Sequence, residues 1–240
     1  MKKLFVLSIM VMGLGCANPS AEPTPVANGK KMIALTANNK PNLKLEYDKG
    51  LLIKENSFFI CETNPTDEYA YEYKNGRIAK LITTLRSLYS STTALCNPAA
   101  GIKSEEIFEY NSQGQLAKVI RTNTTTEYTY NAKGQVEKQA VISSGKSVIT
   151  TFEYDTRGNL IKETDAGGLS VYYTYDDKIN PYYRMNQRPQ WISAFNKSPN
   201  NVIKATGRVN FERSFKYDIE GYPTEVDEDN GVTYKYEYKL

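Results

Sequence analysis

The chain has 240 residues with a hydrophobic fraction of 40% and a charged fraction of 24%, as is ordinary for a globular protein of one large or two small domains. Its net charge of +3 comes from interspersed charges of both signs, so we expect no nucleic-acid partner. Because the sequence contains no histidine, it excludes Ser-His-Asp and Cys-His nucleophile pairs, acid–base catalysis by histidine and histidine-ligated metal sites.

Residues 1–15 have the pattern of a lipoprotein signal peptide. Lys2 and Lys3 make the start positive, and the apolar stretch of residues 4–12 is too short to span a bilayer. A small glycine directly precedes Cys16, as at a lipoprotein processing site. We therefore predict that Cys16 becomes the first mature residue and carries a lipid anchor. The alternative is an ordinary secretory signal that is cleaved nearby.

Residues 16–30 are rich in proline, alanine, asparagine and serine, which predicts a flexible tether between the membrane and the folded part. The rest of the chain, residues 31–240, is expected to form a single β-repeat domain. In an exported protein the two remaining cysteines, Cys61 and Cys96, are expected to form a disulfide. Two unpaired, buried thiols are the alternative.

From residue 45 onward the chain repeats a short pattern, in which an aromatic or leucine residue, a variable residue and a tyrosine precede a turn. The tyrosines of the eight copies are, in chain order, Tyr47, Tyr73, Tyr110, Tyr130, Tyr154, Tyr175, Tyr217 and Tyr236. Six copies have a glycine in the turn that follows: Gly50, Gly76, Gly114, Gly134, Gly158 and Gly221. Spacings near 20 residues suit one hairpin per copy, so we predict about fourteen to sixteen short strands.

The segment Phe152–Glu163 is the best-formed copy. Its aromatic and polar residues alternate, which predicts a strand with one buried face. Asp155 can accept a backbone N–H at the start of the turn, and Gly158 three residues later allows a positive φ. A hairpin with a bulged three-residue loop is therefore expected. Simple alternation in the returning strand predicts that Leu160 and Lys162 share one face.

The pattern aromatic-x-Tyr-[Asp/Asn]-x-x-Gly-x-[Leu/Val] resembles the YD repeat of RHS-type proteins over most of residues 45–240. The stretches Tyr175–Tyr182 and Pro199–Val202 are similar to a family of exported lipoproteins of Gram-negative bacteria, whose domain of unknown function is porin-like in fold. The resemblance implies an all-β fold: an antiparallel meander of YD-type β-hairpin repeats that forms a strongly curved sheet or a closed, water-soluble barrel. It implies no activity.

A lipid-facing barrel is not expected. The positions between the paired aromatics hold charged residues, among them Glu109, Glu153, Lys216 and Lys235. Burying such charges in lipid would cost roughly 2–4 kcal/mol each. We therefore expect a barrel that stands in water and is held at the outer membrane by its lipid, on either the periplasmic or the cell-surface side.

The repeat breaks after Tyr175, where a copy without a turn glycine leads into a long aromatic connection. Aromatic rings beside arginine and asparagine are typical of carbohydrate or peptide sites, and long connections often hold function. The candidate ligand-binding residues are Tyr182, Tyr183, Arg184, Arg188, Trp191 and Phe195. The favoured alternative is that these aromatics plug the end of a curled sheet.

Two acidic patterns have ordinary explanations. The segment Asp227–Gly231 could bind Ca²⁺, but it lacks the spacing of a calcium loop and is typical of a charged hairpin turn. Glu109 and Glu153 could belong to a hydrolytic carboxylate pair, yet they are expected to face Lys118 and Lys162 as cross-strand ion pairs. No catalytic residue, metal site or cofactor is predicted.

The sequence thus predicts a non-enzymatic, membrane-anchored lipoprotein that acts as a binding or scaffolding module. The expected partners are the membrane, through the lipid anchor, and a glycan or a protein ligand. A carboxylate-based hydrolase on the same β scaffold is the alternative function. A toxin-enclosing shell, which the RHS resemblance suggests, is set aside because 240 residues are too few to enclose another domain.

Overall fold

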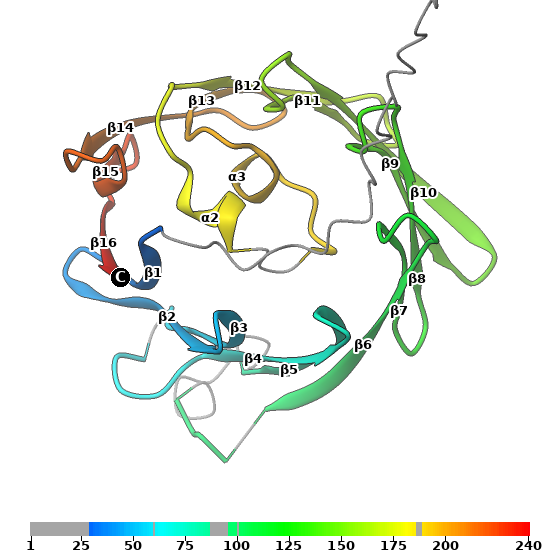
Figure 1. Ribbon diagram of the computed structural model, residues 1–240, viewed down its shortest axis with the longest axis horizontal. Helices are drawn as coiled ribbons and strands as arrows, with labels where there is room; N and C mark the ends of the chain where they lie inside the picture. The colour runs from blue at the N-terminus through cyan, green and yellow to red at the C-terminus, as the bar shows by residue number, and fades with distance from the viewer. Residues whose placement is uncertain (1–28, 60, 87–95, 100, 186–188) are drawn as a thin grey trace, which may run out of the picture.

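The computed structural model describes residues 29–59, 61–86, 96–99, 101–185 and 189–240. Its sixteen strands form one closed barrel in which every strand is antiparallel to both neighbours (Figure 1). Strands that follow one another in the chain are paired, and β1 pairs with β16 to close the ring. The predicted all-β meander is confirmed, in its closed form. None of the helices in these ranges is long and apolar enough to cross a bilayer.

The strands are β1 (Lys31–Ala37), β2 (Lys40–Asp48), β3 (Leu51–Ser57), β4 (Asp67–Lys74), β5 (Arg77–Leu85), β6 (Ile102–Tyr110), β7 (Leu116–Ile120), β8 (Thr125–Tyr130), β9 (Val136–Ser143), β10 (Lys146–Tyr154), β11 (Leu160–Thr164), β12 (Ser170–Tyr175), β13 (Val202–Gly207), β14 (Phe211–Tyr217), β15 (Pro223–Glu228) and β16 (Thr233–Lys239). Two short helices, α2 (Pro181–Arg184) and α3 (Ala194–Lys197), lie between β12 and β13.

Most YD turns are closed by the acidic or amide residue that follows the tyrosine. In the best-formed copy, the backbone N–H of Asn159 donates to Oδ1 of Asp155 at 2.8 Å. Gly158 has a φ of +93° and donates its own N–H to the Asp155 carbonyl at 3.2 Å. The side chains of Asn111, Asn131 and Asp218 accept the equivalent N–H groups in their copies. The predicted turn chemistry is therefore present.

A β-bulge in each YD hairpin changes which residues face inward. Between β10 and β11, Tyr154 pairs with Leu160 and Glu153 pairs with Lys162, so the register shifts by one residue. Leu160 is completely buried beside the inward tyrosine, whereas Lys162 lies on the outer face opposite Glu153. The prediction that Leu160 and Lys162 share a face is wrong, because the bulge interrupts the alternation.

The tyrosines of the repeat link neighbouring hairpins from inside the barrel. The hydroxyl of Tyr110 donates to the carbonyl of Ile78 at 2.9 Å, and that of Tyr130 donates to the carbonyl of Leu116 at 2.7 Å. Tyr73 and Tyr175 make equivalent bonds to the preceding hairpin, and Tyr47 makes one to the carbonyl of Met32 on β1. Burial raises the pKa of Tyr110 and Tyr130 to about 12. Each bond contributes about 1 kcal/mol net, so the repeated tyrosine holds one copy to the next.

Charged residues cover the outer face. Lys162 and Glu153 form the predicted cross-strand ion pair at 2.8 Å. Glu109 lies opposite Lys118 as predicted, but the Lys118 ammonium pairs with Glu127 of the next strand at 3.1 Å. Exposed pairs of this kind contribute about 0–1 kcal/mol each. Their main consequence is a polar exterior around an aromatic interior.

Candidate functional site

The connection between β12 and β13, residues 177–200, is called the plug below, and the structure describes its residues 177–185 and 189–200. Its helices α2 and α3 occupy the middle of the ring of strands (Figure 1). The hydroxyl of Tyr128 on β8 donates to the carbonyl of Gln190 in the plug at 2.8 Å. Gln190 and Ala194 are fully buried. The long connection therefore fills much of the space that the strands enclose.

The plug is an insertion into a YD turn. Asp176 donates its N–H to the carbonyl of Asn201 at 3.1 Å and accepts the N–H of Asn201 on Oδ1 at 3.0 Å. The ordinary turn has the same two bonds between Asp155 and Asn159, at 2.9 and 2.8 Å. The hairpin of β12 and β13 thus keeps its turn bonds although 24 residues, numbers 177–200, lie between the two bonded positions.

Buried polar groups fix the plug in place. The side-chain amide of Asn180 donates to the carbonyls of Phe195 and Ser198, which ties the two helices together. The Ser198 hydroxyl oxygen accepts the N–H of Leu160 at 3.0 Å, which ties the plug to the neighbouring hairpin. Because buried polar groups are costly to leave unpaired, these bonds give the plug one position against the wall.

The predicted ligand-binding residues do not form one cluster. Tyr182 packs edge-on against Tyr236, with 6.4 Å between ring centroids. Phe195 stacks on Phe211 at 5.8 Å, and the guanidinium of Arg213 lies 4.4 Å from the Phe195 centroid. These two side chains are held by β14 and β16, and they line a cavity of about 230 Å³.

The other four candidates lie elsewhere. Trp191 is 45% exposed and contacts the edge of Tyr69 on β4, with 6.4 Å between centroids. Tyr183 is 48% exposed and faces a different part of the wall. The side chain of Arg184 and the whole of Arg188 lie outside the described residues. Of the candidates whose side chains the structure describes, only Tyr183 lines the cavity described next.

A cavity of about 390 Å³ separates the plug from the wall formed by the second to fifth YD copies. The wall contributes Arg77, Tyr110, Gly114, Leu116, Tyr130, Gly134, Gln135, Val136, Tyr154 and Gly158, and the plug contributes Tyr183, Pro189, Ile192 and Lys197. We call it the plug cavity. Three turn glycines lie among its lining residues, so it lies at the end of the barrel that carries the YD turns.

Among the described residues, Arg77 is one of two cations that line the plug cavity. Its guanidinium lies over the ring of Tyr110, 5.5 Å from the centroid. A Cβ at Gly114 would come within 2.4 Å of its Nη2, so the turn glycine makes room for the side chain. The Arg77 Nε is buried and has no hydrogen-bond partner within the described ranges. Gly114 therefore has a packing role besides its positive φ.

Lys197, at the end of α3, is the second cation. Burial lowers the pKa of its ammonium from the ordinary 10.5 to about 8. The side chain is half-buried, and this partial removal from water disfavours the protonated form of its ammonium. In the described part of the chain, no carboxylate forms an ion pair with Lys197. Within the described residues, the cavity therefore contains a positive charge without a carboxylate partner.

The sequence did not predict either cation. Arg77 follows the turn glycine of its copy, and the residue at this position covers the turn glycine of the next copy. Gln135 does so too, with its Nε2 3.5 Å from where a Cβ at Gly158 would lie. The position of Arg77 directly after a turn glycine was therefore the sequence feature that could have identified it. Lys197 had no comparable signal, because its surroundings depend on how the plug folds.

The acidic segments have protein partners. Asp227 accepts the hydroxyl of Thr233, and Glu228 pairs with Arg213. Elsewhere, Arg208 bridges Glu163 at 3.1 Å and Asp165 at 3.6 Å. Burial raises the pKa of Glu163, although the neighbouring Arg208 opposes the change. No group of carboxylates suited to a metal ion is found among the described residues.

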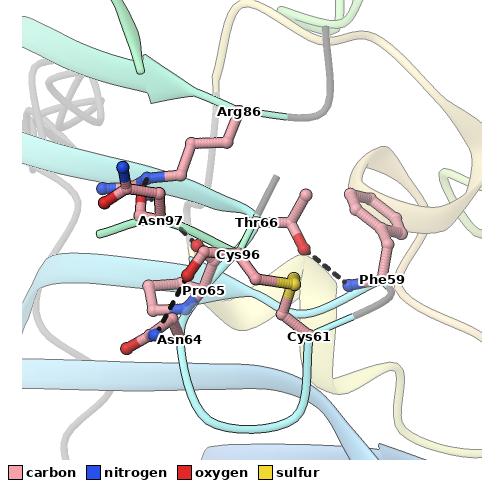
Figure 2. The surroundings of a disulfide bond; sticks show 8 residues. All are labelled: Phe59, Cys61, Asn64, Pro65, Thr66, Arg86, Cys96 and Asn97. Atoms are coloured by element: carbon pink, nitrogen blue, oxygen red, sulfur yellow. Dashed lines mark hydrogen bonds between the residues drawn. A yellow bond between two sulfur atoms is a disulfide. The ribbon is translucent and has the colours of Figure 1, made fainter. Parts of the chain in front are cut away.

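At the opposite end of the barrel, a disulfide joins Cys61 to Cys96, with 5.5 Å between their Cα atoms (Figure 2). The two cysteines belong to the neighbouring connections between β3 and β4 and between β5 and β6. The bond closes a loop with a sequence separation of 35, for which loop entropy gives about 3–4 kcal/mol of stabilisation. This cross-link lies away from the plug cavity.

Beside the disulfide, the side chain of Arg86 is only 3% exposed (Figure 2). Its guanidinium donates to the carbonyls of Pro65, Asn97 and Pro98 at 2.8–3.2 Å. It also pairs with Glu68 at 2.8 Å. These bonds compensate for burying the charge and hold Pro65, Asn97 and Pro98 together beside the disulfide, which indicates a structural role for this end.

Comparison with known proteins gives one family. The Teneurin YD-shell family model matches residues 29–239, which confirms the predicted YD-repeat resemblance. Among solved structures, porin-like proteins from Bacteroides uniformis and Bacteroides vulgatus are each 12% identical, with TM-scores of 0.42 and 0.44. The alignments cover 87% and 88% of this chain, and 98% and 99% of theirs. A chain of the Photorhabdus luminescens Tc holotoxin pore is 10% identical over 79% of this chain and 9% of its own, with a TM-score of 0.34. No curated protein matches the sequence.

Proposed function

Because the chain belongs to the Teneurin YD-shell family, we propose that its barrel is a scaffold that presents the plug cavity as a binding site for a glycan. Family membership supports the structural role of the barrel. The glycan, the site and the membrane anchor are our proposal. The protein acts without catalysis, by holding its ligand between the wall and the plug.

The observation that carries this proposal is the lining of the plug cavity. Its volume of about 390 Å³ lies within the range of about 300–1,000 Å³ that is typical of small-molecule sites. The rings of Tyr130, Tyr154 and Tyr183 offer apolar surfaces for the C–H faces of a sugar. Because the Tyr130 hydroxyl donates to the Leu116 carbonyl, its oxygen remains able to accept a bond from a sugar hydroxyl.

A glycan-binding screen on the purified chain tests the site. Tyr183→Ala removes an exposed aromatic side chain from the plug side of the cavity and is expected to weaken binding at least tenfold. The matched control is Tyr172→Ala on the outer face, where Tyr172 is also about half exposed and contacts Lys162. If both variants bind like the wild type, the plug cavity is not the site.

We further propose that the barrel is anchored in the outer membrane through a lipid on Cys16. The short apolar N-terminal segment before Cys16 supports this, as do the ion pairs on the outer face, which suit a barrel that stands in water. Cys16→Ala is expected to move the protein from the membrane fraction to the soluble fraction. An unchanged membrane fraction would show that the anchor is wrong.

A carboxylate-based hydrolase is the second candidate, and Glu163 is the observation that favours it. Burial raises the pKa of this carboxyl, as a general acid requires, and Arg208 also contacts the nearby Asp165. If the chain hydrolyses a glycan and Glu163→Gln abolishes the turnover, the hydrolase replaces the binding module. Binding without turnover would leave the non-enzymatic function in place.

A further inference from the structure

We propose that the ligand of the plug cavity is a sugar acid, such as a uronic acid, and that Arg77 and Lys197 bind its carboxylate. Arg77 belongs to the barrel wall and Lys197 to the plug, so the ligand would connect the two. This inference rests on the proposed function and adds to it the charge of the ligand and the residues that recognise that charge.

The first argument is that these two cations lack carboxylate partners. The other partly buried arginines with described side chains are paired: Arg86 with Glu68, Arg121 with Glu106 and Arg213 with Glu228. Among the described residues that line the plug cavity there is neither aspartate nor glutamate. Two positive charges therefore face a space to which the described chain contributes no negative charge.

The second argument is the way Arg77 is held. Its guanidinium lies over Tyr110 and beside Gly114, and its buried Nε has no hydrogen-bond partner in the described ranges. A buried N–H donor without a partner is costly. A planar guanidinium suits a carboxylate, because two parallel N–H···O bonds can form at once. A carboxylate in the cavity would give the guanidinium an anionic partner, which the described residues do not supply.

The third argument concerns the remainder of the ligand. A simple anion such as acetate or phosphate would use the cations but would leave most of a cavity of about 390 Å³ unfilled. The rings of Tyr154 and Tyr183 line the same space and suit the apolar face of a pyranose ring. Charge and aromatic surface together favour a sugar ring that carries a carboxylate.

Calorimetric titration of the full chain tests the inference with four probes: glucuronic acid, its uncharged methyl ester, glucose and inorganic phosphate. We expect glucuronic acid to bind at least tenfold more tightly than the other three. The comparison between the acid and its ester uses the wild-type protein, so it does not depend on the folding of any variant.

Variants then assign the two cations. Lys197→Met and Arg77→Gln are each expected to weaken glucuronic acid binding at least tenfold and to leave binding of the methyl ester within about twofold. Lys197→Arg keeps the charge and is expected to retain most of the affinity. Lys204→Met is the matched control, because Lys204 is exposed and pairs with Glu212 outside the cavity; it is expected to bind like the wild type. Far-UV circular dichroism verifies that each variant is folded.

The outcomes separate this inference from the proposed function. If glucose or the methyl ester binds as tightly as glucuronic acid, and Lys197→Met binds like the wild type, the carboxylate is refuted while the glycan site stands. If phosphate binds as tightly as glucuronic acid, the sugar ring is not recognised and the inference fails. If no sugar binds at all, both the inference and the proposed function are wrong.

Discussion

The buried ammonium of Lys197 should make the protein less stable than it would be with an apolar residue. The folded-state pKa of about 8 lies below the ordinary 10.5, and one pKa unit corresponds to about 1.4 kcal/mol. Keeping this lysine charged at pH 7 therefore costs the folded state about 3 kcal/mol, and partial access to solvent brings the expected effect to about 2–3 kcal/mol. Lys197→Met, which keeps most of the side-chain volume, is expected to raise the free energy of unfolding by that amount.

The pH dependence makes this prediction specific. Since the pKa is lowered in the folded state, the destabilisation is complete below pH 8 and disappears as the pH rises toward 10.5. Urea unfolding of the wild type and Lys197→Met should show a large difference at pH 7 and a small one at pH 10.5. The matched control, the exposed Lys204→Met, should change stability by less than about 0.5 kcal/mol. A Lys197→Met variant that is less stable than the wild type at pH 7 would refute the reasoning.

Three further predictions concern the scaffold. Tyr130→Phe removes the bond to the Leu116 carbonyl and should lower the free energy of unfolding by about 1–2 kcal/mol in urea titrations; no loss would show that the hydroxyl contributes nothing. Because burial raises the pKa of Tyr130 from 10.0 to about 12, its contribution is complete below pH 10 and is lost as the pH rises toward 12. Tyrosinate absorbance should therefore rise together with alkaline unfolding. An absorbance rise that is complete before unfolding begins would contradict this prediction. Replacing Cys61 and Cys96 by alanine should lower thermal stability by about 3–4 kcal/mol of unfolding free energy and leave glycan binding by the folded barrel unchanged, whereas lost binding would place the ligand at the disulfide end.

Local chemistry made the hairpins predictable from the sequence. A YD turn needs a hydrogen-bond acceptor such as Asp155 and a residue that tolerates positive φ such as Gly158. Both residue types can be recognised in the sequence of a well-formed copy. Closure into a ring was left open between a curved sheet and a barrel, because it depends on the pairing of β1 with β16, which are far apart in sequence. No local pattern specifies such a contact.

The faces of the returning strands were mispredicted for a different reason. Strict alternation assigns Leu160 and Lys162 to one side, but the bulge adds one residue and puts them on opposite sides. The sequence already indicated the ion pair between Glu153 and Lys162, which requires that shift. The expected shared face of Leu160 and Lys162 therefore conflicted with the expected ion pair between Glu153 and Lys162. The structure contains the ion pair.

The site was predictable only as a segment. The break in the repeat after Tyr175 correctly drew attention to the connection that becomes the plug, and both the ligand-site and plug alternatives referred to the same residues. The best-formed repeat also contributes to the cavity, because its Tyr154 and Gly158 are among the lining residues. Tyr154 is part of the barrel wall and also lines the cavity. The periodicity of the sequence predicts its place in the wall but not its place in the cavity.

The most direct test of the plug cavity as a binding site is a crystal structure of the full chain with glucuronic acid. We predict that the sugar lies between the plug and the wall, with its ring against Tyr183 and its carboxylate at Arg77 and Lys197. A sugar bound elsewhere, for example beside the exposed Trp191, with only water in the plug cavity, would contradict the proposal.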